Sequence, residues 1–437
     1  MRDASLRACQ RILATHGQQG WVAITREFGR TFRLNGIVVT CEPEAVRALL
    51  MERPHAERRP PIHRLMAALP GADGILFKDG EPWLTRTRAV MPVFQQRNID
   101  ACSTITYETT LAHLARWQAA PGSLELAGAV QQLGVATLLR IGYGLDPADP
   151  AAVRLGQALV AYKQLTMRPR RRDRLDELGL LPERLFDLPW ILAGIVQMWL
   201  RTRDVEQALR EVMASRDAAG ERPDWIRQLG AAGFDVRQLA VEVNHLYGAF
   251  NAVDYAAAAA LYELARRPDL AHTIREETRA VAADGRPPAR DDLLRMPVTR
   301  ACILETLRRY PVTMAVIRQT GTPLNIAGDA VPAGAQVMIL LHALHHHPDF
   351  WNDADVFEPG RWLESQLPAV PYSYVPFLDG SRKCIGRAMA EMHLLIVITT
   401  VLRRFDVAVD GEAVVPPFII PRFATPLPFR LVPAPTA

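Results

Sequence analysis

A long helical segment with almost no charge in its middle is the strongest constraint on how this chain can fold. Asp235, with Gln238 three residues later, forms a capping-box-like start. The helical pattern then continues to Pro268, roughly 30 residues or about 45 Å at the helical rise, which is enough to cross a whole domain. Residues 256–261 carry no charge, and a helix that is apolar on most sides is buried. We therefore expect this helix to run through the centre of the protein.

Shorter elements around this helix predict a mainly α protein with small β-sheets. A second helix covers Thr299–Arg309 and ends before Pro311, and strand-like segments follow at Val316–Thr320 and Val337–Leu341. The sequence contains no internal repeat, no low-complexity tract and no linker. We expect one domain over residues 1–437.

Composition excludes several classes of protein. Hydrophobic residues make up 49% and charged residues 22% of the 437 residues, as in globular proteins rather than disordered chains. A net charge of +4 is too weak to indicate nucleic-acid binding. The N-terminus lacks the apolar core of a signal peptide, and no apolar run is long enough to span a membrane. Five cysteines without CxxC pairs suggest a reducing setting, so we expect a soluble, cytoplasmic protein.

The loop Phe377–Gly386, immediately before a helical pattern over Arg387–Arg404, contains a lone cysteine, Cys384. Amide N–H groups and the helix dipole at such a position stabilise a thiolate, which can bind iron. Gly380 and Gly386 would allow a tight turn and the close approach of a flat cofactor, while Arg382 offers a cation for a cofactor carboxylate. An isolated cysteine is nevertheless more often inert and buried.

Two further motifs precede this loop. Glu305 and Arg308 lie three residues apart on one helix face, and Arg361 follows in the segment Phe357–Trp362. Together with the cysteine loop, the chain resembles the cytochrome P-450 family of haem-thiolate enzymes: Glu305 and Arg308 match its ExxR helix, Arg361 its PERF-like segment, and the loop its FxxGxRxCxG signature. The resemblance extends over nearly the whole chain, starting near Gly74.

The resemblance implies a cytochrome P-450 fold, with haem b between the long central helix and the proximal cysteine loop. Cys384 would be the axial thiolate ligand of the iron, and Phe377 would pack beside its sulfur. The haem propionates would be held by Arg382, Arg318 and Trp83. Where the family often has arginine four residues after this tryptophan, the chain has Thr87, so Arg88 or Arg86 would serve instead. Glu305, Arg308 and Arg361 would form a buried triad that anchors the proximal loop.

The chain departs from the family on the long helix, where an acid and a threonine usually deliver protons. Asn251 and Ala252 occupy these positions, and neither side chain can replace the missing groups. A monooxygenase could rely on substrate hydroxyls or water, with Asp254 or Tyr255 as a substitute acid. Alternatively, Phe250-Asn251-Ala252 resembles a segment of allene oxide synthases, which isomerise fatty-acid hydroperoxides without a redox partner, although the cysteine loop here lacks their expansion. In a third interpretation Asn251 only bonds a neighbouring helical carbonyl, and the protein binds haem without catalysis.

The family fold also implies a substrate pocket and a redox partner. The pocket residues are largely apolar and favour a lipophilic small molecule: Phe77, Leu246, Phe250, Val253, Thr313, Met314, Val316 and Phe423. No electron-transfer module is fused to the chain, so a monooxygenase would need a separate ferredoxin or flavodoxin with its reductase. The basic residues that would steer this partner to the proximal face are Arg86, Arg88, Arg382, Lys383 and Arg387.

Two other features carry less weight. The histidines His342, His345, His346 and His347 have spacings that suit a metal, but their segment matches a structural stretch of the family. The apolar stretch Leu188–Leu200 is too short for a membrane span, which leaves peripheral membrane contact open. We expect no nucleic-acid partner.

Overall fold

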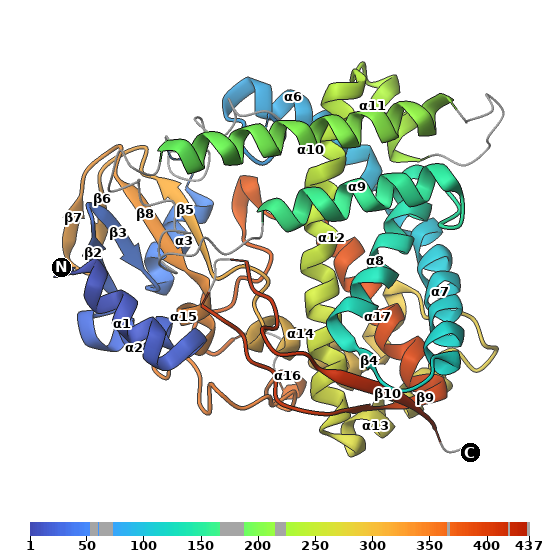
Figure 1. The fold of residues 1–437 in the computed structure, drawn as a ribbon. Coiled ribbons are helices and arrows are strands. Elements are labelled where there is room, and N and C mark those ends of the chain that lie inside the picture. The colour runs from blue at the N-terminus through green and yellow to red at the C-terminus, as the bar shows by residue number, and fades with distance from the viewer. Residues whose placement is uncertain are drawn as a thin grey trace. The chain divides into compact units, whose positions relative to one another are not determined.

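The computed structural model describes residues 1–52, 60, 73–166, 188–214, 224–364, 368–417 and 420–434 (Figure 1). Contacts divide the chain into two compact units. The first contains Met1–Arg58, Ile99–Leu133 and Ala252–Ala437, and the second contains Arg59–Asn98 and Gly134–Asn251. The expectation of one domain over residues 1–437 stays a prediction.

Helices dominate the described chain, which confirms the predicted mainly α class with small sheets. The longest, α12, has 30 residues and lies where the sequence predicts it. The helices are α1 (Leu6–His16), α2 (Gly20–Phe28), α3 (Pro43–Met51), α6 (Gly80–Val90), α7 (Gln96–Ala119), α8 (Leu126–Tyr143), α9 (Pro150–Thr166), α10 (Leu188–Ala214), α11 (Trp225–Ala231), α12 (Val236–Ala265), α13 (Pro268–Val281), α14 (Pro297–Arg309), α15 (Leu341–His346), α16 (Arg361–Glu364) and α17 (Arg387–Arg404).

Three small sheets belong to the first unit. The largest has the strand order β1-β2-β3-β8-β5 and the next has the order β4-β10-β9, while β6 and β7 form a hairpin. In the largest sheet, β5 pairs antiparallel with β8, so that Arg318 lies opposite Val337. The strands are β1 (Arg2–Ala4), β2 (Thr31–Leu34), β3 (Ile37–Thr40), β4 (Leu124–Glu125), β5 (Ala315–Gln319), β6 (Leu324–Ile326), β7 (Asp329–Val331), β8 (Gln336–Leu340), β9 (Phe405–Val409) and β10 (Pro428–Pro433).

The core of the first unit is built around the C-terminal half of α12. Ala256–Ala260 are at most 1% exposed, as expected from their lack of charge. They belong to one apolar cluster with large side chains of α17, including Leu394, Leu395 and Ile398. Small alanines on one helix leave room for large side chains from its neighbours. Within the described part of the chain, no helix combines the length and the hydropathy needed to cross a membrane.

Candidate functional site

The loop before α17 presents Cys384. Its backbone N–H donates to the Phe377 carbonyl at 2.8 Å, and the Lys383 N–H donates to the Gly380 carbonyl at 3.3 Å. The second bond closes the short 3-10 turn Gly380–Arg382, and Gly386 caps α17. The loop therefore folds back on itself and leaves Cys384 three residues before the first turn of α17.

Glycine is required at position 380 for two physical reasons. Its φ of 73° lies in the left-handed region, which side chains with a Cβ rarely adopt. A Cβ at this position would also overlap the backbone carbonyl of Leu50 on α3. This glycine therefore allows α3 and the cysteine loop to pack closely.

Cys384 differs from the other cysteines in its surroundings. All five cysteines lie in the described residues, and Cys384 is exposed whereas Cys9, Cys41, Cys102 and Cys302 are buried. The pKa of the Cys384 thiol is raised, chiefly because packing around the sulfur desolvates it, while a Gly386 hydrogen bond and the charge of Arg387 act in the opposite direction. In the protein chain by itself, desolvation of the thiol therefore outweighs the helix start, and a metal ion that binds the sulfur would favour its deprotonated form.

Two buried arginines belong to the same unit as this cysteine. Arg382, in the loop, is 7% exposed, and Arg318, on β5, is 1% exposed. One guanidinium nitrogen of Arg318 donates to the Ile317 carbonyl at 3.1 Å. Phe377 packs partly buried against the core cluster, and the guanidinium of Arg387 lies 5.5 Å from the centre of its ring. These two side chains place positive charge in the interior of the unit.

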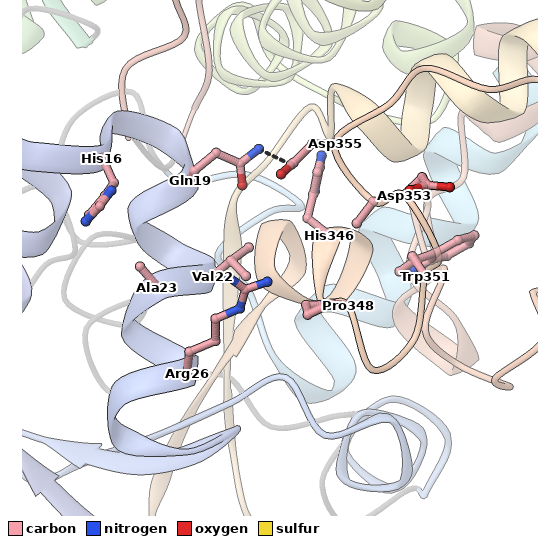
Figure 2. Close-up of a pocket in the computed structure, with 11 residues that line it drawn as sticks. His16, Gln19, Val22, Ala23, Arg26, His346, Pro348, Trp351, Asp353 and Asp355 are labelled. Atoms are coloured by element: carbon pink, nitrogen blue, oxygen red, sulfur yellow. Dashed lines mark hydrogen bonds between the residues drawn. The ribbon is translucent and has the colours of Figure 1, made fainter.

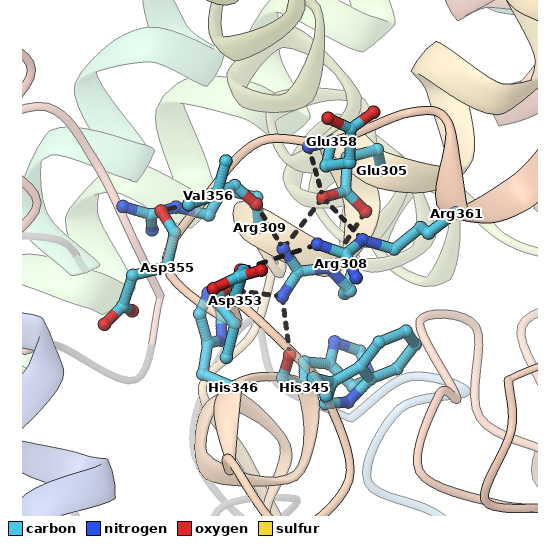
Figure 3. A network of polar contacts seen from close by, with 12 residues as sticks. Glu305, Arg308, Arg309, His345, His346, Asp353, Asp355, Val356, Glu358 and Arg361 are labelled. Atoms are coloured by element: carbon cyan, nitrogen blue, oxygen red, sulfur yellow. Dashed lines mark hydrogen bonds and ion pairs between the residues drawn. The ribbon is translucent and has the colours of Figure 1, made fainter.

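The carboxylate of Glu305 accepts five hydrogen bonds (Figure 3). Arg308 donates to both carboxylate oxygens, at 2.9 and 2.8 Å. Arg361 donates from Nε at 3.2 Å, the Glu358 backbone N–H at 2.9 Å and the Trp362 indole at 2.8 Å. Glu305 and Arg308 are fully buried. The structure thus brings the three motif residues into one network that also ties α14 to the segment before the cysteine loop.

Arg308 uses all five of its N–H donors. Besides the two bonds to Glu305, it donates to the carbonyls of His345, Ala354 and Val356 at 2.9, 2.8 and 3.0 Å. Its guanidinium also lies 5.2 Å from the ring centre of Trp351. Because a guanidinium has five N–H groups in a fixed fork, this arrangement is fully satisfied and rigid.

Asn251 is held at both ends of its amide, within the second unit. Its Nδ2 donates to the Tyr247 carbonyl at 2.9 Å, one turn earlier on α12. Its Oδ1 accepts a hydrogen bond from Lys163 on α9. Lys163 was missed at the sequence level because it stands in no motif, and only the packing of two distant helices brings it to Asn251.

Comparisons with known proteins place these features in a family. A family model described as Cytochrome P450 matches residues 229–430. Cytochrome P450 4A10 of Mus musculus is 34% identical over 154 residues, 35% of this chain and 30% of that protein. Cytochrome P450 3A5 of Homo sapiens is 30% identical over 182 residues, 42% of this chain and 36% of that protein. These matches support membership of the cytochrome P450 family.

The fold of this chain agrees with a solved structure along its whole length. A crystal structure of a 6-coordinated cytochrome P450 from Thermus thermophilus has a TM-score of 0.71 and 18% sequence identity, and the match covers 99% of each chain. The matched region spans only about a third of the length of the two curated relatives above. The comparison thus establishes the P450 fold.

The residues of this chain fit the haem that the cytochrome P450 family binds through a cysteine thiolate. The first unit offers Cys384 in a loop that also contains the buried cation Arg382. Separately, α12 is exposed at Gly248 and Ala249, although the residues on either side of this pair are buried. A Cβ added to Gly248 would meet nothing within 4 Å. In the first unit, the soft sulfur ligand and the buried guanidinium groups suit a dianionic iron cofactor.

Two arginines near Trp83 lie differently from the sequence expectation. Arg88 has a 72% exposed side chain and pairs with Glu81 at the surface, and its role as a propionate ligand stays a prediction. Arg86 is buried and donates to Glu242 at 2.6 Å. Trp83 is half-buried. The predicted basic cluster also loses two members, because buried Arg86 and Arg382 cannot steer a partner, whereas Arg88, Lys383 and Arg387 are exposed.

The expected pocket residues fall into both units. In the second unit, Phe250 packs 6.1 Å from Trp225 between ring centres, and Phe77 lies 5.7 Å from the His245 ring, while Leu246 is half-buried. In the first unit, Met314 is 1% exposed, and its sulfur accepts a hydrogen bond from Gln18. The other predicted pocket residues of the first unit are half-buried: Val253, Thr313, Val316 and Phe423. Their common role as a pocket stays a prediction.

The four histidines after β8 are a packed structural group. His342, His345, His346 and His347 are at most 4% exposed. Among the residues described, no group of three or more His, Cys, Asp or Glu side chains is arranged to hold a metal ion. Burial lowers the pKa of each of these four histidines, and that of His345 falls to about 3. His393 on α17 is likewise buried, with its pKa lowered to about 4.

These histidines predict a loss of stability in mild acid. The unfolded chain binds protons at histidine below pH of about 6.5, whereas the buried rings stay neutral, so folding must exclude those protons. Stability should therefore be complete above that pH and fall as the pH drops, by up to about 1.4 kcal/mol per pH unit for each buried histidine. Urea midpoints at pH 7 and 5.5 would measure this, and equal midpoints would contradict it.

Proposed function

We propose that this P450 is a haem-thiolate monooxygenase that inserts one oxygen atom from O2 into a lipophilic small molecule. The observation that carries the proposal is the exposed Cys384, held in its loop by Gly380 and followed by the start of α17. Haem b bound through a thiolate supplies the reductive activation of O2. The chain itself supplies the ligand, the charge around the cofactor and the apolar surroundings.

Each residue of the proposed cofactor site has a defined task. Cys384 is the protein ligand of the iron, and Phe377 shields its sulfur from water. Gly386 donates a hydrogen bond to Cys384 that moderates the basicity of the sulfur. Arg382 and Arg318 bind the propionates, because guanidinium and carboxylate form paired, charge-assisted hydrogen bonds. Trp83 adds an indole donor.

Electrons in this proposal come from a separate ferredoxin or flavodoxin with its reductase. Lys383 and Arg387 are exposed on either side of Cys384. Arg387 also pairs with Glu391 at 2.8 Å. Exposed cations beside the ligand would attract an acidic electron carrier, and such steering weakens as ionic strength rises.

Proton delivery is the unusual step. Ala252 has no hydroxyl, and both polar ends of the Asn251 amide are engaged by Tyr247 and Lys163. Tyr255, considered as a substitute acid, is buried with its pKa raised by desolvation, so it stays protonated. Asp254, the other candidate for the substitute acid, is also buried, with 4% of the residue exposed. We infer that substrate hydroxyls or ordered water complete the relay.

The hydroperoxide-isomerase alternative requires the Asn251 amide to meet a peroxide oxygen. The hydrogen bonds just described direct this amide toward α9 and along α12 instead. The bond to the Tyr247 carbonyl is the one expected if Asn251 only bonds a neighbouring helical carbonyl, as in the interpretation of a non-catalytic haem protein. Turnover separates the three cases, because a non-catalytic haem protein gives no product with electron donors or with peroxides.

Adding the missing hydroxyl should improve coupling. In Ala252→Thr, we expect a larger fraction of the electrons from NAD(P)H to reach product, because a hydroxyl can hold the water that delivers protons. Ala252→Val is the control, since valine has the shape of threonine without its hydroxyl. Product formed per NAD(P)H consumed is the measurement, and Asn251→Ala should retain donor-dependent turnover. Turnover of a fatty-acid hydroperoxide without donors, lost in Asn251→Ala, would establish the isomerase instead.

A further inference from the structure

A pocket in the first unit is lined by residues other than Cys384 and the others proposed to hold haem. It has a volume of about 340 Å³ and lies between α2 and the segment that follows α15 (Figure 2). Trp351, Val22 and Ala23 give it apolar walls, and His346, Asp353 and Asp355 contribute polar groups. None of these residues belongs to the cofactor or substrate residues assigned above.

His346 presents a hydrogen-bond acceptor at this pocket. Its Nδ1 lies 2.9 Å from the carbonyl oxygen of His342. A carbonyl can only accept, so Nδ1 carries the proton and Nε2 carries a lone pair. Nε2 has no hydrogen-bond partner in the described chain although the residue is 2% exposed. Burial lowers the pKa of the ring, so Nε2 remains an acceptor at neutral pH.

The charges around the pocket favour a cation. In the lining, Asp353 and Asp355 contribute two exposed carboxylates, against one exposed guanidinium from Arg26. Outside the lining, Arg308 and Arg309 also act on the His346 ring, but Arg308 is paired with Glu305. One oxygen of Asp355 accepts a hydrogen bond from Gln19 at 2.5 Å, which fixes this carboxylate at the pocket. In Figure 2 the His346 ring rises beside this hydrogen bond. A neutral acceptor and two carboxylates call for a ligand with N–H donors and positive charge.

Arginine side chains hold the backbone of residues 352–356, which includes both pocket aspartates. Arg361 donates to the carbonyls of Asn352 and Asp353. Arg308 donates to the carbonyls of Ala354 and Val356, and Arg309 to that of Asp355. Five consecutive carbonyls thus accept from three arginines, two of which also bind Glu305. Any ligand that fixes the side chains of this segment also fixes the backbone that surrounds Arg308.

We propose that this pocket binds a small organic cation with a guanidinium or ammonium head and an apolar body. An N–H of the head donates to Nε2 of His346, the carboxylates of Asp353 and Asp355 balance its charge, and the body lies against Trp351 and Val22. Binding stabilises residues 352–356 and, through their carbonyls, the surroundings of Arg308. The site is independent of the proposed oxygenase activity.

Calorimetric titration of the holoprotein with benzylguanidinium tests the proposal. This cation has no lone pair at neutral pH with which to ligate iron, so an unchanged haem spectrum confines binding to the protein. We expect saturable binding and a higher melting temperature. N-Benzylurea, which keeps the N–H donors and shape without the charge, should bind at least about tenfold more weakly.

Two sets of variants locate the site. Asp353→Asn combined with Asp355→Asn should weaken benzylguanidinium binding about tenfold, since each exposed charge contributes modestly. Asp349→Asn, on the same stretch but outside the pocket, should leave binding unchanged. His346→Phe should also weaken benzylguanidinium binding. If His346→Phe does not fold, the double aspartate variant tests the site by itself. Absence of saturable binding, equal binding of the urea, or unchanged affinity in the double aspartate variant would each overturn the proposal.

Discussion

Replacing Cys384 with serine should abolish the thiolate signature of the haem. A serine hydroxyl is a much poorer ligand for iron because it stays protonated at neutral pH, whereas a thiol can be deprotonated outright by a metal. Reduced Cys384→Ser protein under carbon monoxide should therefore lack the strongly red-shifted Soret band of thiolate-ligated haem. Substrate oxidation should be undetectable, and haem content should fall.

A matched variant separates ligation from general damage to the fold. Cys102→Ala removes a buried cysteine of the same unit, and it should keep the red-shifted band with only a modest loss of stability. A red-shifted band that survives in Cys384→Ser, or disappears equally in Cys102→Ala, would contradict the assignment of Cys384 as the ligand.

Local patterns in the sequence were sufficient to predict the elements nearest the site. The predicted helix over Arg387–Arg404 has these bounds in the structure, and α12 covers Val236–Ala265 within the predicted segment. Both helices have long apolar stretches and clear starts, which are features of the local sequence. The predicted strands were each displaced by one residue, to Ala315–Gln319 and Gln336–Leu340. Strand ends are set by pairing with a distant partner, which no local pattern contains.

The roles of charged side chains were harder to predict, because partners far apart in the sequence decide them. Arg86 is buried on Glu242, 156 residues away, while Arg88, two residues later, is exposed. Nothing in the local sequence distinguishes these two arginines. Lys163 reaches Asn251 from 88 residues away, and no motif marks it. The pKa direction at Cys384 likewise follows from tertiary packing, which opposes the local effect of the helix start.

The triad combines a local motif with distant contacts. Glu305 and Arg308 face each other because they are three residues apart on α14, which the sequence predicts. Their burial depends on Arg361, Trp362 and the backbone of Glu358, more than 50 residues later. An exposed pair with this spacing would contribute little to stability. In the fully buried pair, water cannot replace a lost partner, so removing one member costs much more than it would at the surface.

Glu305→Ala should destabilise the protein more than any other single change considered, by about 3–5 kcal/mol, because it leaves the Arg308 guanidinium buried without its counter-charge. Two Arg308 donors and the Trp362 indole would also lose their acceptor. Since this network adjoins the segment leading to the cysteine loop, we expect mostly haem-free or insoluble protein. Glu358→Gln changes an exposed carboxylate of the same segment and should cost under about 1 kcal/mol. Melting temperature and haem content per chain measure both variants. Wild-type values for Glu305→Ala would show that the triad does not maintain the fold.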